Sequence, residues 1–267
     1  MYNLYSMKID REIEIIKGIP ALYFPAGDAL CIADLHLGYE EALMENSGIA
    51  LPSGQLKDVE QKLEAAIASC GYEPTKLIIN GDLKHVFSES SRQEWKEVPI
   101  FIQFALNYVK EIILVRGNHD TFLGPLKRFG SRIKVVNALS YHDTLFIHGH
   151  NRDFARILSE GSERTVVIAH EHPIIVLGDS VGARVRLPCF LIGRLGPGAR
   201  RVIVMPAFSP LAGGTPVNLA SKEDFLSPIL RSPEVEIDKM EVYTVDEDVG
   251  IMAFPELRSW KDVSLSL

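Results

Sequence analysis

Polar side chains that bind metals or transfer protons follow several apolar runs of this sequence. The tetrad Gly117-Asn118-His119-Asp120 comes directly after Ile112-Ile113-Leu114-Val115, whose length and β-branched content are typical of a buried parallel strand. The same arrangement recurs earlier, where residues 29–33 lead into Asp34-Leu35-His36 and residues 77–80 lead into Gly81-Asp82. Ligands bind at the carboxyl ends of strands in open α/β sheets. We therefore expect these carboxylate, imidazole and amide groups to share one rim.

Histidine is concentrated near the predicted strand ends. Of the eight histidines, seven lie within a few residues of such an end: His36, His85, His119, His148, His150, His170 and His172. A lone histidine beside an apolar strand is most often structural, but five repeats of the pattern favour a ligand set. Mixed carboxylate and imidazole ligands suit Mn, Fe and Zn, and the amide oxygen of Asn118 suits the harder ions. With Asp82 as a bridge, two ions would lie ~3.5–4 Å apart, the spacing used for phosphoryl chemistry.

The elements that must position these residues begin with a βαβαβ succession. Apolar spacing predicts helices at about Gly38–Met44, over an apolar face from Leu56 to Ile67, and from a start at Ser90–Glu94. Two short apolar runs, Ile13–Ile16 and Ala21–Phe24, precede them and are predicted to be edge strands.

After Asp120 the strands follow one another too closely for helices between most of them. Strands are predicted at 133–136, 144–147, 165–169, 183–187, 190–192 and 202–205, then a loop at 206–216, a short helix at 222–230 and a last hairpin of 241–244 with 250–254. Such spacing implies hairpins and a second, more antiparallel sheet stacked on the first.

Composition limits the class of protein. The chain has 267 residues, of which 46% are hydrophobic and 24% charged, enough for a large core, and no linker is evident, so we expect one domain over residues 1–267. There is no apolar stretch of the ~20 residues that span a bilayer, and residues 1–11 lack the apolar region of a signal peptide, which predicts a soluble cytoplasmic protein. Cys31, Cys70 and Cys189 suggest neither a disulfide framework nor a zinc knuckle.

The net charge of −7 is unevenly distributed. Residues 116–201 hold 13 Lys and Arg against 7 Asp and Glu. This basic segment is either ordinary solvated surface or a means of attracting an anionic substrate to the rim. The whole chain is not basic enough for non-specific duplex binding to be its main activity.

Together these motifs resemble those of the calcineurin-like metallophosphoesterases. The ordered set is Asp34-Leu35-His36, Gly81-Asp82, Gly117-Asn118-His119-Asp120, Ile147-His148-Gly149-His150 and His170-Glu171-His172, which spans over half the chain. The continuation Gly81–His85 and the late segment Pro206–Gly214 resemble more closely the archaeal and bacterial phosphoesterases associated with a DNA ligase and a helicase. The resemblance implies an α/β fold, a four-layer αββα sandwich with two stacked mixed β-sheets.

By matched position, the resemblance implies two divalent metal ions, most naturally Mn, with Fe, Zn and Ni as alternatives. The first would be bound by Asp34, His36 and His172, both by a bridging Asp82, and the second by Asn118, His148 and His170. A metal-bridging hydroxide would attack phosphorus while His119 protonates the leaving oxygen.

The remaining predicted roles concern substrate and support. Asp120 would orient His119 through a hydrogen bond, with a turn or helix N-cap as the alternative. His85, His150 and Arg116 are candidates for phosphate contact. The sequence departs from the family pattern at two places. After Asp82 come Lys84 and His85 in place of the usual acid, so that a cation or an imidazole would meet the phosphate. Before His170, Ala169 replaces the usual glycine.

The implied function is a phosphodiesterase acting on small nucleotide-type or cyclic phosphodiesters. The alternative is a nuclease acting on nucleic-acid ends in a repair complex, with a DNA ligase or helicase as a partner, and a non-catalytic scaffold is a third reading. A Gly-rich loop, Ser209–Thr215, would place backbone N–H groups near a phosphate. The sequence predicts no membrane partner and does not decide between a monoester, a diester, a cyclic phosphate and a DNA end.

Overall fold

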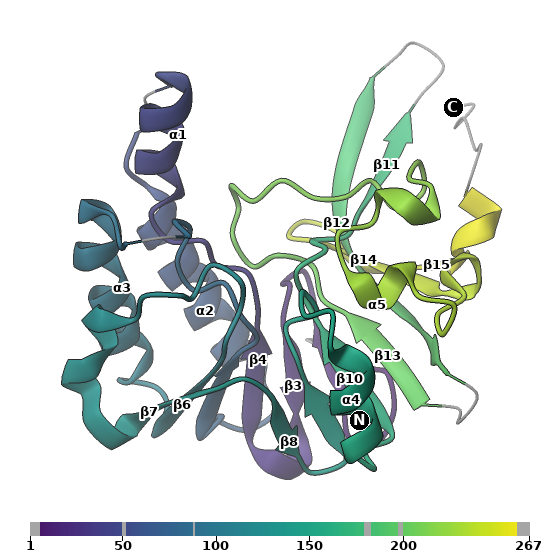
Figure 1. The fold of residues 1–267 in the computed structure, drawn as a ribbon, viewed down its shortest axis with the longest axis horizontal. Coiled ribbons are helices and arrows are strands. Elements are labelled where there is room, and N and C mark those ends of the chain that lie inside the picture. The colour runs from purple at the N-terminus through teal and green to yellow at the C-terminus, as the bar shows by residue number, and fades with distance from the viewer. Residues whose placement is uncertain (1–5, 50–51, 88, 179–182, 197–199, 261–267) are drawn as a thin grey trace.

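The first half of the chain forms a seven-stranded sheet whose strands lie in sequence order. The computed structural model describes residues 6–49, 52–87, 89–178, 183–196 and 200–260 (Figure 1). The strands of this sheet are β1 (Ser6–Lys8), β2 (Glu14–Ile16), β3 (Leu22–Phe24), β4 (Ala29–Ile32), β5 (Lys76–Ile79), β6 (Glu111–Val115) and β7 (Ile133–Val136). Strands β4 to β7 run parallel, which confirms the βαβαβ prediction and directs their carboxyl ends to one rim.

The prediction that residues 13–16 and 21–24 form edge strands is wrong. Strand β1 pairs antiparallel with β2, and β3 lies between β2 and β4, so both predicted edge strands are interior. The short polar segment Ser6–Lys8 carries little apolar signal because it is itself the partly exposed edge.

Helices α2 (Gln55–Ser69) and α3 (Arg92–Ala105) cover the outer face of this sheet, whereas α1 (Tyr39–Ser47) projects beyond the carboxyl ends of the strands (Figure 1). The predicted apolar stripe of α2 buries Val59, Leu63 and Ala66. Helix α3 begins where predicted, since the Ser91 side chain accepts a hydrogen bond from the Glu94 backbone amide and Glu94 accepts one from the amide of Ser91 in return. A 3-10 segment, Gly124–Arg132, links the β6 loop to β7.

The second sheet is mixed and largely antiparallel, as predicted. Its strands are β8 (Leu139–Tyr141), β9 (Thr144–Phe146), β10 (Thr165–Ile168), β11 (Ile174–Gly178), β12 (Arg184–Leu195), β13 (Arg200–Val204), β14 (Glu241–Asp246) and β15 (Gly250–Glu256). They lie in the order β15-β14-β12-β13-β10-β9-β8, and β11 pairs with β12. The parallel pairs are β9 with β10 and β10 with β13.

Several boundaries of this half differ from the prediction. The strands expected at 183–187 and 190–192 form one strand, β12, because Pro188, which cannot donate to a ladder, falls where β12 changes partner from β11 to β13 and β14. Strands β8 and β11 and helix α4 (Phe154–Glu160) were not predicted. The helix expected at 222–230 is divided into a 3-10 turn, Lys222–Asp224, and α5 (Pro228–Arg231), with Pro228 at the first helical position.

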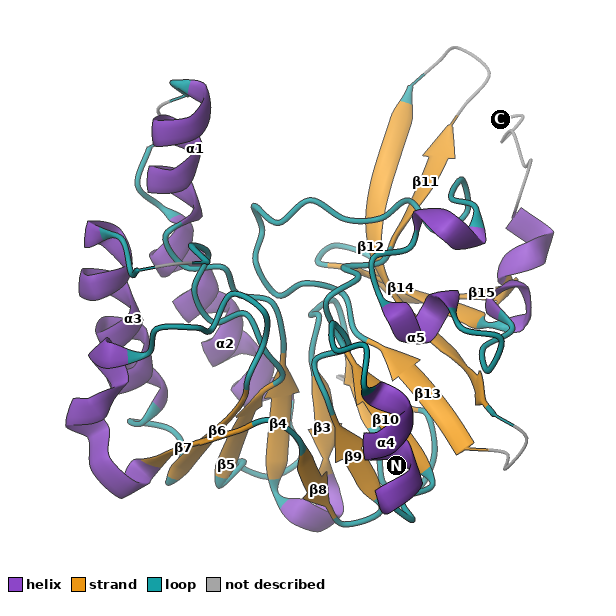
Figure 2. Ribbon diagram, in the orientation of Figure 1, coloured by secondary structure: helices purple, strands orange, loops and turns teal. Residues whose placement is uncertain are grey.

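Apolar clusters fill three interfaces and define four layers (Figure 2). One cluster joins α2 and α3 to the first sheet, and another joins the second sheet to α4 and α5. Between the sheets, Phe24 of β3 contacts Phe146 of β9 with ring centroids 5.2 Å apart, and Cys31 and Phe190 are fully buried. The predicted αββα sandwich is thus confirmed, whereas its extent as one domain over residues 1–267 stays a prediction.

Two smaller expectations concern cysteines and membranes. Cys31, Cys70 and Cys189 are all free, so no disulfide stabilises the fold. Within the described residues, no helix has the length and apolar character needed to cross a membrane.

Candidate metal centre

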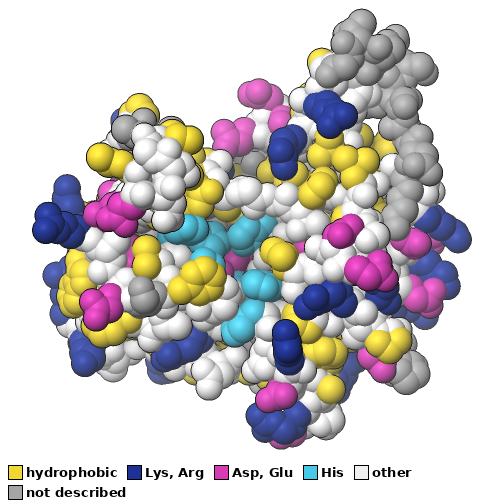
Figure 3. All heavy atoms as spheres, turned by 45° about the horizontal axis from the view of Figure 1, so that its top comes forward, with side chains coloured by type: hydrophobic (Ala, Val, Ile, Leu, Met, Phe, Trp, Pro, Cys, Tyr) yellow, Lys and Arg dark blue, Asp and Glu magenta, His cyan; other side chains and the backbone are white. Residues whose placement is uncertain are grey.

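The loops that follow β4, β5, β6, β9 and β10 meet at one rim of the sandwich. They carry all seven predicted ligands: Asp34, His36, Asp82, Asn118, His148, His170 and His172. Figure 3 shows histidine side chains gathered along a hollow of this face. The rim therefore brings together the groups that the sequence pattern pointed to.

The first group of ligand atoms consists of Asp34, His36 and His172. One oxygen or nitrogen from each lies within 4.8 Å of the others. Nε2 of His172 lies 3.3 Å from Nε2 of His36 and 3.3 Å from Oδ1 of Asp34. Two imidazole nitrogens and a carboxylate oxygen directed at one point form a suitable set for a divalent cation.

The second group consists of Asp82, His148 and His170, again within 4.8 Å of one another. Nε2 of His148 lies 3.3 Å from Oδ2 of Asp82 and 3.2 Å from Oδ1 of Asn118. The same Oδ2 of Asp82 lies 3.7 Å from Nε2 of His36, which belongs to the first group. Asp82 thus stands between the two groups, where a bridging carboxylate must stand.

One buried atom tests whether metal ions fit here. Oδ1 of Asp34 is buried and accepts no hydrogen bond from the residues that the structure describes. A buried carboxylate oxygen that accepts no hydrogen bond is costly, and a cation bound between it and Nε2 of His172 would satisfy it. The ligand set fits two divalent ions on these grounds, while its mixture of oxygen and nitrogen atoms is compatible with Mn, Fe and Zn alike.

Hydrogen bonds from the far side of two rings select the nitrogen that faces the metals. Nδ1 of His148 donates to the carbonyl oxygen of Asn80 over 2.9 Å, and Nδ1 of His172 donates to that of Gly213 over 2.9 Å. When the ring is neutral, each bond leaves Nε2 unprotonated and directed at its group, the usual arrangement of metal-binding histidines. The Gly-rich loop therefore presents a carbonyl oxygen to the site at Gly213, whereas backbone N–H groups were expected.

Burial and charge set the protonation of these groups. Burial opposes ionisation of Asp82, but the nearby His148 and His36 hold its pKa well below the usual range. Burial also works against a charged His148, yet Asp82 and Asp34 raise its pKa to about 9. Burial lowers the pKa of His36 to about 3 and that of His170 to about 4. At neutral pH the protein without metal thus holds an anionic Asp82 against a cationic His148.

The ligand loops hold strained backbone. Among described residues, seven other than glycine have positive φ, and five of them are predicted ligands: Asp34 (55°), His36 (47°), Asp82 (51°), His170 (71°) and His172 (47°). Each such conformation costs ~1–3 kcal/mol and persists only where the surroundings enforce it.

Two glycines make room for this packing. A Cβ on Gly81, whose φ is +94°, would lie 2.0 Å from Nδ1 of His148, and a Cβ on Gly117 would lie 2.1 Å from Oδ1 of Asp82. Glycine at both positions is therefore a steric requirement of the ligand cluster.

Asp120 does not have its expected role. Its buried carboxylate accepts hydrogen bonds from the backbone amides of Gly117 and Asp82, both over 2.9 Å, and of Leu83 over 3.0 Å. The predicted hydrogen bond to His119 is wrong: Nδ1 of His119 bonds the carbonyl oxygen of His85 instead. Asp120 lies in a turn, which was the alternative prediction, and its hydrogen bonds connect the β6 loop to the β5 loop. Burial, followed by repulsion from Asp82, raises its pKa to about 6.

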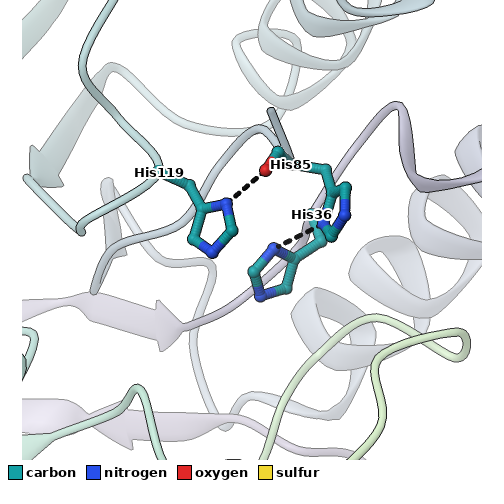
Figure 4. A group of neighbouring side chains, drawn as sticks. All are labelled: His36, His85 and His119. Carbon is teal, nitrogen blue, oxygen red and sulfur yellow. Dashed lines mark hydrogen bonds between the residues drawn. The ribbon is translucent and has the colours of Figure 1, made fainter. Parts of the chain in front are cut away.

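His119 is buried beside the centre. Its backbone amide donates to Oδ1 of Asp82 over 2.9 Å, and its Nε2 lies 3.8 Å from Oδ2 of the same residue. His36, His85 and His119 form a third group, whose ring nitrogens also lie within 4.8 Å of one another and could by distance hold a metal ion (Figure 4). Within it, Nδ1 of His85 lies 3.3 Å from Nδ1 of His36.

The other candidates for substrate contact lie around this centre. His150 and the exposed Arg116 line a cavity of ≈ 320 Å³ that His148 also lines, on the side of the second group. Lys84 lies outside the centre, because its buried ammonium group donates to the carbonyl oxygen of Val86 and lies 3.9 Å from Oε2 of Glu94. Of the two residues that replace the usual acid, only His85 faces the ligands.

Two supporting residues were missed in the sequence. The Gln55 side chain donates to the carbonyl oxygens of Leu35 (3.2 Å) and His36 (2.9 Å), but the first residue of a helix gives no indication of which loop it faces. Buried Glu171 accepts hydrogen bonds from Thr215 and from the amide of Ser227. Because Glu171 lies between the predicted ligands His170 and His172, its position in the sequence could have indicated a supporting role.

The chain matches one protein family in sequence and several solved structures in fold. The family model described as calcineurin-like phosphoesterase matches residues 29–193. No curated protein sequence matches the chain. Among solved structures, the nuclease MPE of Pseudomonas putida has a TM-score of 0.61 and 21% identity, covering 93% of this chain and 98% of that one. The phosphoesterase Yfce of E. coli has a TM-score of 0.37 and 14% identity, covering 83% of this chain and 90% of that one. The likeness to the nuclease MPE shows the shared fold.

The family match includes every loop that contributes to the two ligand groups. It extends over more than half of the chain, from the start of β4 into β12. The chain therefore belongs to the calcineurin-like phosphoesterase family and is a metal-dependent phosphoester hydrolase.

Proposed function

We propose that this protein is a dinuclear phosphodiesterase that hydrolyses nucleotide-type phosphodiesters. The observation that carries the proposal is Asp82, whose Oδ2 lies 3.3 Å from a nitrogen of the second ligand group and 3.7 Å from one of the first. Two ions bound there would activate water and neutralise charge that develops on the phosphate. Asp34, His36 and His172 hold one ion, Asn118, His148 and His170 the other, and Mn is the metal we expect.

The leaving oxygen takes its proton from His119. This imidazole lies beside Asp82 without belonging to either ligand group, and its Nδ1 is occupied by the His85 carbonyl oxygen. Nε2 is the nitrogen directed toward the centre. A non-catalytic scaffold would need no imidazole at this position beside a complete ligand set. The scaffold is therefore the weakest of the three hypotheses, behind the phosphodiesterase and the nuclease.

Charge favours a diester over a monoester. A monoester brings two negative charges to the centre, and a diester brings one. The cation next in sequence to the ligands, Lys84, is directed at Glu94 and Val86, and so it does not offset a second charge. Phosphate contacts then come from His85, His150 and Arg116, of which Arg116 alone is a permanent cation.

The second candidate is a nuclease acting on nucleic-acid ends within a repair complex that includes a DNA ligase or helicase. The observation that favours it is the likeness, over 93% of this chain, to a structure described as a nuclease. Both candidates use the same chemistry and differ in the size of the substrate.

A panel of substrates tests the proposal. The protein reconstituted with Mn is assayed on p-nitrophenyl phosphate, bis-p-nitrophenyl phosphate, 2′,3′-cyclic nucleotides, and single-stranded and duplex oligonucleotides. We expect bis-p-nitrophenyl phosphate to be hydrolysed faster than the monoester, and Asp82→Asn to abolish both activities. His142→Asn is the matched control, because His142 is exposed, belongs to no ligand group and has a positive φ that asparagine tolerates. A preference for the monoester would refute the diesterase assignment.

A further inference from the structure

The loop between β5 and α3 leaves a large aromatic side chain exposed on top of the proposed acid. Phe87 is 59% exposed. Its ring centroid lies 3.7 Å from that of His119, with the two planes inclined by 30°. One face of the Phe87 ring is thus covered by the imidazole, and much of the remaining surface is open to a ligand.

Hydrogen bonds to the backbone hold this ring in place. The Thr121 hydroxyl donates to the carbonyl oxygen of Phe87, and Nδ1 of His119 bonds the carbonyl oxygen of His85, two residues earlier (Figure 4). Ser90 donates to the carbonyl oxygen of Phe122 over 3.3 Å. The β5 and β6 loops are therefore tied together on both sides of Phe87, and its ring lies on the His119 imidazole.

Two further exposed aromatic side chains belong to the same pair of loops and the start of α3. Trp95 is 51% exposed and Phe122 is 43% exposed, with ring centroids 6.1 Å apart. We call Phe87, Trp95 and Phe122 the aromatic shelf. In Figure 3, hydrophobic side chains lie directly beside the histidines of the hollow. Large apolar side chains exposed together beside a reaction centre are typical of a binding surface.

We propose that Phe87 stacks on the base of the nucleoside that leaves, which makes this base a determinant of substrate choice. The inference rests on the proposed function, because His119 faces the leaving oxygen and whatever is attached to that oxygen must lie next to His119. The group that projects there and meets a flat apolar ring is a nucleobase, which stacks on aromatic side chains irrespective of its identity.

Stacking predicts a measurable discrimination. Base–aromatic stacking typically contributes ~1–3 kcal/mol per base, which is a factor of about 5–150 in binding or in kcat/KM. A substrate with an abasic sugar on the leaving side keeps the same leaving alkoxide and loses only the stack. The comparison therefore separates base recognition from the chemistry of the leaving group.

The experiment uses thymidine dinucleotides and their analogues with a tetrahydrofuran abasic residue on either side, with Mn as the metal. Product analysis identifies the nucleoside that leaves. We expect the wild-type protein to prefer a base over the abasic sugar on that side by at least fivefold in kcat/KM, Phe87→Leu to reduce this preference to below twofold, and Phe87→Trp to retain it. Tyr72→Leu, at a side chain that is 76% exposed and outside the shelf, is the control and keeps the preference.

A role of Phe87 in holding His119 alone gives a different result. Phe87→Leu would then lower kcat/KM equally on base-bearing and abasic substrates, and that outcome overturns the inference. Hydrolysis of 2′,3′-cyclic nucleotides without hydrolysis of any dinucleotide leaves the proposed function intact and also overturns the inference. Failure to hydrolyse any diester refutes the proposed function itself.

Discussion

Replacement of His119 by alanine separates the role of a general acid from that of a metal ligand. The contact of His119 with Asp82 that orders the loop runs through the backbone amide, 2.9 Å from Oδ1, and alanine keeps that amide. The residue is only 9% exposed, but the ring that covers it belongs to Phe87, which is itself 59% exposed, so water can reach the space that alanine leaves. We therefore expect His119→Ala to fold and to bind two equivalents of Mn like the wild type.

The magnitude of the loss follows from the role assigned to the ring. General acid catalysis is typically worth ~10²–10⁴-fold, or about 3–5 kcal/mol of barrier. A good leaving group such as p-nitrophenolate departs without a proton, so the deficit on bis-p-nitrophenyl phosphate should be below tenfold. A ribose alkoxide needs the proton, so the deficit on a dinucleotide or 2′,3′-cyclic nucleotide should reach the full range.

The assay measures kcat on both classes of substrate for wild type, His119→Ala and the control His142→Asn, together with metal content. Equal deficits on the two classes would refute the reasoning, and so would loss of the second metal from His119→Ala. Either result would make His119 a ligand or a structural residue. His85, with Nδ1 3.3 Å from that of His36, and His150 would then be the next acids to test.

Further predictions concern the ligands themselves. Asp82→Asn should weaken both metal sites together in calorimetric titrations, whereas Asn118→Ala should chiefly empty the second, and a wild-type protein that saturates at one equivalent of Mn contradicts the dinuclear centre. Gly81→Ala should lower the melting temperature and Mn content more than Gly48→Ala does: both glycines have positive φ, but a Cβ at Gly48 meets no atom within 4 Å, so the control carries only the ~1–2 kcal/mol backbone cost. His148, whose pKa Asp82 raises to about 9 against the effect of burial, is protonated at pH 7.5 without metal and must be neutral to bind one. Mn binding should therefore release at least one proton and tighten as pH rises toward 9. Titrations in Tris and in HEPES should differ in enthalpy accordingly, and identical enthalpies after correction for metal–buffer binding would exclude this coupling.

Much of the centre could be read from the sequence because its chemistry is local. Each ligand lies within a few residues of the end of a buried strand, and apolar runs such as Ile112–Val115 are identifiable without a structure. Parallel strands bring their carboxyl ends to one edge, so a repeated strand-then-Asp/His pattern is enough to predict that the ligands converge. The two stacked sheets follow from the same pattern and from the closely spaced strands after Asp120, whereas the four-layer arrangement was implied by the family resemblance.

Contacts between segments far apart in the sequence were decided only by the tertiary structure. Asp120 bonds backbone amides 37 and 38 residues away, and the Nδ1 partner of His119 lies 34 residues away, so neither partner could be inferred from spacing. The direction of Lys84 depends on buried Glu94, and the continuity of β12 through Pro188 depends on which strands flank it. Exposure of Phe87 is likewise invisible in a sequence, because apolar residues normally indicate the core and only the packing of the two loops leaves this one at the surface.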